Sequence, residues 1–228
     1  MNRAPGPAPL ETGSKDLTQT AAPWVPERAD MEELRRAAVD CRGCELWKPA
    51  TQVVFSAGNP RAPLVLVGEQ PGDVEDRKGI PFVGPAGRLL QEALDEAAVP
   101  REDVYVTNAV KHFRFTERGK RRIHATPQVT HIRACLPWLE AELILVDPAL
   151  IVCLGATAAR ALLGSSFRVT KQRGQVLELT TPIGVRPVLA TVHPSAVLRA
   201  TGEDRDEAFA GLVADLRTAG DAVSRQER

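Results

Sequence analysis

The 228-residue chain lacks any apolar run that approaches the roughly eighteen residues of a membrane-spanning helix. Its first thirteen residues, MNRAPGPAPLETG, contain no apolar stretch that could act as a signal peptide. We therefore expect a cytoplasmic protein with no membrane partner. The chain also lacks net charge, because 29 Lys and Arg balance 29 Asp and Glu. With 43% hydrophobic and 25% charged residues, its composition is that of one ordinary globular catalytic domain.

Cysteine is scarce, with four residues in the whole chain. In a reducing compartment these are expected to be metal ligands or core residues, not disulfides. Cys41 and Cys44 form a C-x-x-C pair, which is typical of metal ligands. Cys153 lies in the apolar segment LIVCL and fits a small core residue better.

Proline divides the chain into a tail and a domain. Residues 1–27 carry five prolines among small and polar residues, which predicts a flexible N-terminal tail. We expect one domain over residues 28–220 and a short C-terminal tail over residues 221–228. Asp30 and Glu33 have the spacing of a capping box and predict a short helix through Val39.

Strand and helix patterns alternate along the rest of the chain. Short apolar runs predict strands at residues 63–67, 103–107, 149–154, 175–180 and 187–192. Helical spacing predicts helices at 85–98, 156–163 and 206–219, and another that Thr126 caps with Pro127 in its first turn. This order predicts an α/β fold, in which a central, mainly parallel four-stranded sheet is flanked by helices.

Polar clusters follow three of the predicted strands: GEQPGD at residues 68–73, Thr107-Asn108, and HPS at residues 193–195. Each cluster alone has an ordinary explanation as a turn or a cap. Ligands of parallel sheets bind beyond the carboxyl ends of the strands. Together the clusters therefore predict a ligand site at one edge of the sheet.

A basic segment, KHFRFTERGKRRIHATP, follows the second cluster at residues 111–127. It carries six Lys and Arg against Glu117 alone, and a histidine near each end, His112 and His124. Such a segment is either a contact for phosphates or a solvated surface loop, and charge alone favours the loop.

The order and spacing of these motifs resemble the uracil-DNA glycosylase superfamily, specifically its iron-sulfur, family 4-like branch. The resemblance covers about residues 31–216, and it implies an α/β/α fold. Within the branch, KRRIH at residues 120–124 and the Gln of GEQPGDVED, Gln70, resemble the UdgX type, which forms a covalent bond to DNA after uracil is excised.

The resemblance implies a pocket for an extruded uracil base. Phe82 would stack on the base, Asn108 would pair with N3 and O4, and His193 would donate to O2 as charge builds on the leaving base. Gln70 and Asp73 would complete the uracil-binding set. The alternatives are a core phenylalanine and a buried histidine with no ligand.

The implied chemistry involves a carboxylate and a nucleophile. Glu69 would stabilise positive charge on the deoxyribose C1′. Asp73 and Asp76 are secondary candidates, either as orienting groups or as solvated turn residues. His124 would attack C1′ and leave a stable histidine adduct. Two other functions stay open: an ordinary hydrolytic glycosylase in which His124 only lines the groove, and a noncatalytic protein that binds damaged DNA.

The expected partner is uracil-containing DNA, single-stranded as well as double-stranded, and the expected product is free uracil. Lys120, Arg121, Arg122 and Arg199 would contact phosphates, which position DNA without specifying a base. We expect a monomer.

The branch also implies a structural [4Fe-4S] cluster. Cys41, Cys44 and Cys135 match its ligand positions, and His112 stands where the remaining cysteine is expected. Histidine ligation of iron-sulfur centres has precedent. On spacing alone, a zinc site with three Cys and one His competes with the cluster.

Overall fold

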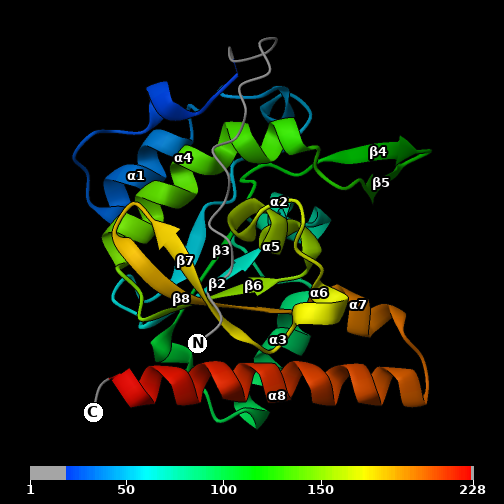
Figure 1. The fold of residues 1–228 in the computed structure, drawn as a ribbon. Helices are drawn as coiled ribbons and strands as arrows, with labels where there is room; N and C mark the ends of the chain where they lie inside the picture. Colours follow the sequence, from blue (N-terminus) through cyan, green and yellow to red (C-terminus); the bar gives the residue numbers. More distant parts are fainter. Residues whose placement is uncertain (1–18, 227–228) are drawn as a thin grey trace.

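The computed structural model describes residues 19–226 and contains a six-stranded mixed sheet (Figure 1). The strand order is β1-β3-β2-β6-β8-β7. The strands are β1 (Ser56–Gly58), β2 (Leu64–Gly68), β3 (Val104–Asn108), β6 (Leu150–Leu154), β7 (Val176–Thr181) and β8 (Gly184–Thr191). The four central strands run parallel, whereas β1 and β7 pair antiparallel at the two edges.

The predicted four-stranded sheet is therefore wrong in its strand number. The parallel centre was predicted correctly because buried parallel strands are continuous apolar runs. β1 has only the three small residues Ser56, Ala57 and Gly58, which give no apolar pattern. β7 was recognised as a strand, but its antiparallel position at the edge depends on its pairing with β8.

Helices cover both faces of the sheet, because alternate strand residues point to opposite sides. On β2, Val65 and Val67 pack against one group of helices, while Leu64 and Leu66 pack against the other. The first group is α1 (Met31–Ala38), α4 (Val129–Val146) and α5 (Ala156–Leu163), and the second includes α3 (Pro85–Glu96) and α8 (Glu203–Gln226). Figure 1 shows the layers, with α3 and α8 below the sheet and α1 and α4 above it.

The remaining elements are short. They are the helices α2 (Asp73–Lys78), α6 (Val169–Gln172) and α7 (Pro194–Arg199), the 3-10 turns η1 (Ala22–Trp24), η2 (Glu45–Trp47) and η3 (Arg101–Asp103), and the strands β4 (Phe115–Arg118) and β5 (Arg121–His124).

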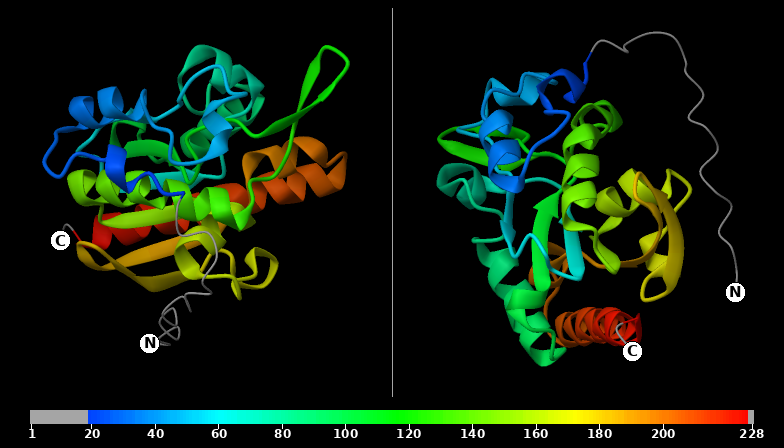
Figure 2. Two further views of the ribbon diagram at one scale, coloured as in Figure 1. Left: turned by 90° about the horizontal axis from the view of Figure 1, so that it is seen from above. Right: turned by 90° about the vertical axis from the view of Figure 1, so that its left-hand side faces the viewer.

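The basic segment is a β-hairpin, not an irregular loop. β4 and β5 pair antiparallel in a sheet of their own, with Arg118 opposite Arg121. Gly119 has a φ of 61°, which suits glycine in a two-residue hairpin turn. The hairpin projects from the body of the protein, as the left view of Figure 2 shows.

Two helix starts illustrate how local capping decides a boundary. The predicted capping box of Asp30 and Glu33 is confirmed at the start of α1. The predicted start at Thr126 and Pro127 is wrong, because α4 begins at Val129 with Gln128 as its cap. The His131 ring accepts a hydrogen bond from the Gln128 backbone N–H at 3.0 Å and so fixes the first turn.

Both predicted tails differ from the structure where it describes them. Residues 1–18 lie outside the described part of the chain. Ala21, inside the predicted tail, is buried and donates its backbone N–H to the Ala134 carbonyl at 2.7 Å. At the other end, α8 continues to Gln226, past the predicted end at Ala219, because Ala222 and Val223 also pack into the core.

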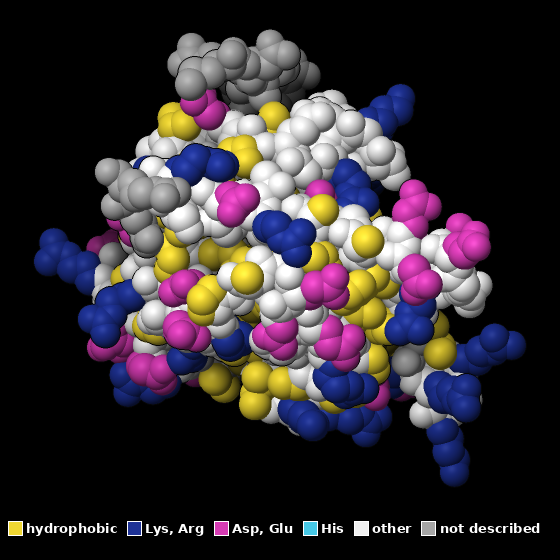
Figure 3. All heavy atoms as spheres, turned by 90° about the horizontal axis from the view of Figure 1, so that it is seen from below, with side chains coloured by type: hydrophobic (Ala, Val, Ile, Leu, Met, Phe, Trp, Pro, Cys, Tyr) yellow, Lys and Arg dark blue, Asp and Glu magenta, His cyan; other side chains and the backbone are white. Residues whose placement is uncertain are grey.

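The outer surface of the α8 layer is mixed in charge. Acidic and basic side chains are interspersed on this face, as Figure 3 shows. Such a surface is typical of a solvated face and not of a phosphate-binding patch. Among residues 19–226, none of the helices is both long and apolar enough for a membrane crossing.

Candidate active site

A cavity of about 700 Å³ lies at the carboxyl edge of the parallel strands. Its lining comes from the ends of β2, β3, β6 and β8 and from the hairpin. Of the predicted site residues it includes Glu69, Gln70, Phe82, Asn108, His124, His193 and Arg199. The strand ends meet here because the four strands run in the same direction, as predicted from the polar clusters.

Glu69 and His124 both line the cavity and contact each other. The His124 Nε2 atom lies 3.3 Å from the Glu69 Oε1 atom, and the Thr157 hydroxyl donates to the other carboxylate oxygen. Burial would raise the pKa of Glu69, but the hydrogen bonds from His124 and Thr157 outweigh it and hold that pKa below its usual range. Glu69 is therefore a carboxylate at neutral pH, and it contacts an imidazole that is 48% exposed.

His193 is held as a neutral donor. Its Nδ1 atom accepts the Ser195 backbone N–H at 3.1 Å, so the proton of the neutral ring sits on Nε2. Burial lowers the pKa of His193 to about 4, although nearby Glu69 opposes the shift. A neutral imidazole that lines the cavity can donate one hydrogen bond to a ligand without titrating near pH 7.

Phe82 and Asn108 line the same cavity beside Gly68. The Phe82 ring centroid lies 6.3 Å from that of His193, with the two planes 28° apart. A Cβ atom at Gly68 would come within 2.3 Å of the Asn108 Oδ1 atom and 2.7 Å of the Phe82 ring. Only glycine therefore allows the amide and the ring to approach the end of β2 this closely. Phe82 itself has a φ of 56°, a strained conformation for a bulky residue.

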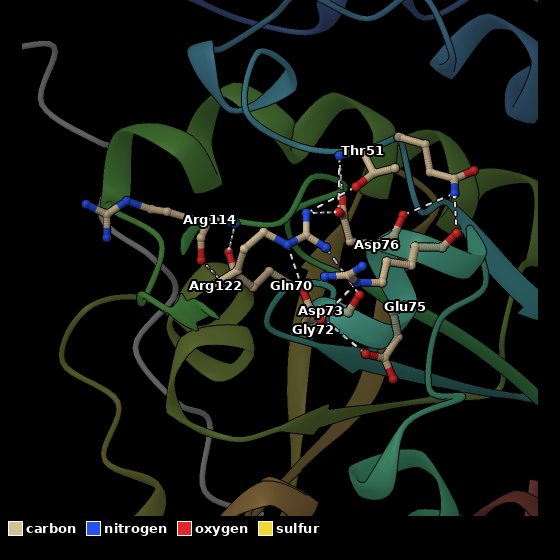
Figure 4. Close-up of polar contacts among 10 residues, drawn as sticks. Thr51, Gln70, Gly72, Asp73, Glu75, Asp76, Arg114 and Arg122 are labelled. Atoms are coloured by element: carbon tan, nitrogen blue, oxygen red, sulfur yellow. Dashed lines mark hydrogen bonds and ion pairs between the residues drawn. The ribbon is translucent and has the colours of Figure 1, made fainter. Parts of the chain in front are cut away.

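Gln70 supports the hairpin with its side chain. Its amide nitrogen donates to the carbonyls of Arg114 and Ala125 at 3.1 and 3.2 Å, and its amide oxygen accepts the Arg114 N–H at 3.0 Å. These bonds join the two residues that flank the hairpin, Arg114 before β4 and Ala125 after β5, and Figure 4 shows the contact with Arg114. The three contacts engage both ends of the amide that was predicted to bind uracil.

The predicted phosphate contacts separate into two groups. Lys120 and Arg121 are exposed at the hairpin turn, and Arg199, on α7, donates to the Ser195 hydroxyl at 3.1 Å beside the cavity. The Arg122 guanidinium instead points into the protein, where it pairs with Asp73 and Asp76 at 2.5 and 2.6 Å. Asp73, a predicted uracil ligand, is thus engaged in an ion pair.

The four predicted metal ligands surround a second, smaller cavity. Cys41, Cys44, His112 and Cys135 all line it and all are buried. Two N–H groups already point at sulfur: the Trp138 indole donates to Cys41 Sγ and the Lys111 backbone to Cys135 Sγ, each at 3.3 Å. Cys153 lies apart on β6, fully buried, as expected for a core residue.

The donor chemistry of this cavity fits an iron-sulfur or zinc group. Burial raises the pKa of Cys44 to about 11 and that of Cys135 to about 12, so both thiols would have to lose a proton on binding the group. Within residues 19–226, no three Cys, His, Asp or Glu side chains already stand in the arrangement of a metal site. The fit of this cavity to an iron-sulfur or zinc group therefore rests on the residue types and on the N–H···S hydrogen bonds.

A family model of the uracil DNA glycosylase superfamily matches residues 55–217, which include both the cavity lining and the hairpin. The chain belongs to the uracil DNA glycosylase superfamily. It is 39% identical over 170 residues to a "Type-4 uracil-DNA glycosylase" of Thermotoga maritima, a match that covers 74% of this chain and 83% of the relative. Relatives of the same name from Archaeoglobus fulgidus and Pyrobaculum aerophilum are 37% and 36% identical, over 74% and 75% of this chain and 83% and 85% of theirs.

Two residues of this superfamily member that support the site were missed from the sequence. Thr157 holds Glu69, and Glu75 accepts N–H groups from Gly84 at 2.7 Å and Gly72 at 3.2 Å, which ties two cavity loops together. Thr157 follows the strand β6, so the same strand-end rule could have found it. Glu75 has the spacing of a capping box from Gly72, but its bond to Gly84 depends on the fold.

Proposed function

We propose that this protein excises uracil from DNA and then becomes joined through His124 to C1′ of the deoxyribose. The observation that carries the proposal is the 3.3 Å contact between His124 and Glu69 at a cavity that Phe82, Asn108 and His193 also line. The type-4 relatives are named uracil-DNA glycosylases, which supports the excision of uracil from DNA. The covalent step rests on His124 and its KRRIH motif.

Uracil would enter the cavity as an extruded base. Phe82 is only half-buried and can stack on the base, while the buried Asn108 can accept from N3 and donate to O4. Cytosine reverses this donor pattern and would leave buried polar groups unpaired, at a cost of about 1 to 3 kcal/mol each. This arrangement favours uracil over cytosine.

Cleavage breaks the bond between C1′ and N1, and the electron pair leaves with uracil. The neutral His193 donates its Nε2 proton in a hydrogen bond to O2 and stabilises the uracil anion. The Glu69 carboxylate stabilises the positive charge that develops on the sugar. Both groups have the required protonation state at neutral pH, as the directions of their pKa shifts support.

Capture of C1′ then uses the electron pair of a neutral imidazole nitrogen of His124. The ring proton passes to Glu69 and then to solvent, and the departed uracil anion gains a proton from water. An imidazole bound to carbon is a poor leaving group, so the adduct is stable and the protein does not turn over.

One experiment distinguishes this function from the two alternatives. The protein is incubated with uracil-containing single-stranded DNA, and both free uracil and a protein–DNA band that survives boiling in detergent are measured. Equal amounts of uracil and adduct support the proposal, excess uracil without a band indicates hydrolytic turnover, and neither product indicates a binding protein. The same oligonucleotide with thymine in place of uracil serves as the control.

His124→Ser tests the nucleophile. We expect the band to disappear and uracil release to continue, because water can then capture C1′. An adduct that persists in this variant would exclude His124.

We also propose that Cys41, Cys44, His112 and Cys135 hold a structural [4Fe-4S] cluster. Cys135→Ser should lower the iron and sulfide content of the purified protein. Cys153→Ala is the matched control, because Cys153 is equally buried but lies on β6, and it should leave both contents unchanged. A colourless protein that contains zinc would contradict the cluster and favour the zinc alternative.

The proposal also covers the contacts with DNA, the oligomeric state of the protein and its location in the cell. Lys120, Arg121 and Arg199 would contact phosphates of single-stranded or double-stranded DNA before the covalent step. Each duplex phosphate neutralised should cost about 0.9 log units of affinity per log unit of salt. We expect a cytoplasmic monomer, which size-exclusion chromatography and cell fractionation can check.

A further inference from the structure

The hairpin that carries His124 needs support from the rest of the protein. β4 and β5 form a sheet of two strands, and isolated two-stranded hairpins are marginally stable in water. Their residues are mostly exposed, and His124 itself is 48% exposed. The 3.3 Å contact between His124 and Glu69 therefore requires an anchor outside the hairpin.

Arg122 makes the contacts of such an anchor. Its Nε atom donates to Asp73 at 2.5 Å, and its Nη1 atom donates to Asp76 at 2.6 Å and to the Thr51 hydroxyl at 3.1 Å. Figure 4 shows the guanidinium between the two carboxylates. The Arg122 side chain is only 14% exposed and that of Asp76 is fully buried. Asp76 is fixed in turn by the Thr51 backbone N–H at 3.0 Å.

Aromatic rings complete this anchor on the hairpin side. The Arg122 guanidinium lies 5.4 Å from the centre of the Phe113 ring and 5.0 Å from that of Phe115. The Phe113 ring, which is buried, also lies 6.1 Å from the His124 ring. The side chains of Arg122 and His124 therefore both lie beside the Phe113 ring.

The position of Arg122 in β5 links the anchor to the reacting groups. Arg122 and His124 are two residues apart on one strand, so both side chains point to the same face, at a spacing of about 6.8 Å. Asp73 begins α2, four residues after Glu69 in the same segment. The ion pairs thus join the segment that carries His124 to the segment that carries Glu69.

We propose that Arg122 is a positioning residue that clamps the hairpin onto α2 and so holds His124 against Glu69. Its role differs from that of Arg121, whose exposed side chain is available to phosphate. The inference rests on the proposed covalent step, because the clamp matters most where His124 must compete with water for C1′.

The test compares Arg122→Ala with Arg121→Ala, which removes the same charge from the adjacent residue of the same strand. The first measurement is the ratio of free uracil to covalent adduct on uracil-containing single-stranded DNA. We expect Arg122→Ala to raise this ratio at least tenfold, because a misplacement of about 1 Å can cost about 100-fold in rate. Arg121→Ala should weaken DNA binding and lower its salt dependence. It should still keep the wild-type ratio, because uracil and adduct both form from the DNA that is bound. Arg122→Lys should give an intermediate ratio, because an ammonium keeps the charge but lacks the planar fork.

The second measurement is hydrogen exchange of the hairpin amides without DNA. Exchange should be faster in Arg122→Ala than in Arg121→Ala, and the increase should be larger at the hairpin amides than at those of the central strands. Thermal unfolding of Arg122→Ala should also shift to a lower temperature, because Asp76 stays buried without its counter-charge. Equal ratios and equal exchange in the two alanine variants would overturn the clamp. If the wild type releases uracil without forming an adduct, the covalent function fails, and the exchange rates alone support or overturn the clamp.

Discussion

A buried ion pair between Lys111 and Glu142 offers a sharp test of what stabilises this fold. Lys111 and Glu142 pair through their side chains, and each side chain is 1% exposed. The Glu142 carboxylate also accepts hydroxyl hydrogen bonds from Tyr105 at 2.8 Å and from Thr107 at 2.9 Å. The Lys111 ammonium donates to the Asn108 carbonyl at 3.0 Å. The pair therefore connects α4 to the strand end that carries Asn108.

The perturbation is Glu142→Gln, which preserves size and removes charge. The amide oxygen of the glutamine can still accept a hydrogen bond from one hydroxyl. The amide nitrogen, however, is a hydrogen-bond donor surrounded by other donors. Lys111 remains buried without a counter-charge. Breaking a buried ion pair by removing one partner costs about 3 to 5 kcal/mol. Proteins of this kind have an unfolding free energy of about 5 to 15 kcal/mol, so we expect a loss of roughly a fifth or more of the total.

Urea unfolding, followed by tryptophan fluorescence, measures this loss. One of the three tryptophans, Trp138, is buried against Phe55. Glu140→Gln is the matched control: it makes the same substitution two residues earlier on α4. Burial raises the pKa of the Glu140 carboxyl. Loss of its charge should change the unfolding free energy by no more than about 0.5 kcal/mol. A loss below about 1 kcal/mol for Glu142→Gln, in protein with a normal metal content, would refute the argument that the buried lysine depends on this carboxylate.

Two further predictions follow from the cavity. Gly68→Ala should lower uracil release strongly while the domain still folds, because the added Cβ collides with Asn108 and Phe82; release at the wild-type rate would show that these two side chains need not lie where they do. The pKa of His193 is about 4 in the folded protein because of burial, against about 6.5 when exposed. The unfolded chain therefore binds a proton that the folded chain does not, and the unfolding free energy should fall as the pH drops from about 6.5 to about 4. In urea titrations at several pH values, His193→Gln should make this fall shallower, and an unchanged slope would contradict the buried neutral ring.

Strand and helix patterns were readable where burial is continuous. The runs that became β2, β3 and β6 are buried throughout and mostly apolar, since both faces of each strand are covered. The capping box of Asp30 is local chemistry and was therefore predictable. The edge strand β1 and the hairpin were missed as strands because their stability comes from pairing and not from an apolar pattern.

The sequence predicted which residues form the candidate site better than it predicted the role of each residue. Polar residues after parallel strands had to meet at one edge, and Glu69, Asn108 and His193 do so. The contacts that side chains make with the hairpin region were harder to predict. Gln70 and Asp73 lie in the predicted cluster, yet their polar atoms bind Arg114 and Arg122, which come from more than forty residues away.

The sequence by itself determined the α/β class, the parallel centre of the sheet, the strand ends that line the cavity and the superfamily to which the chain belongs. These features follow from burial, which acts on each segment separately, and from residue types at fixed spacing. The tertiary structure alone decided which charged side chains are exposed to solvent and which form ion pairs within the protein. Arg121 and Arg122 are adjacent and chemically identical, but a strand directs them to opposite faces, so that one meets solvent and the other meets two carboxylates.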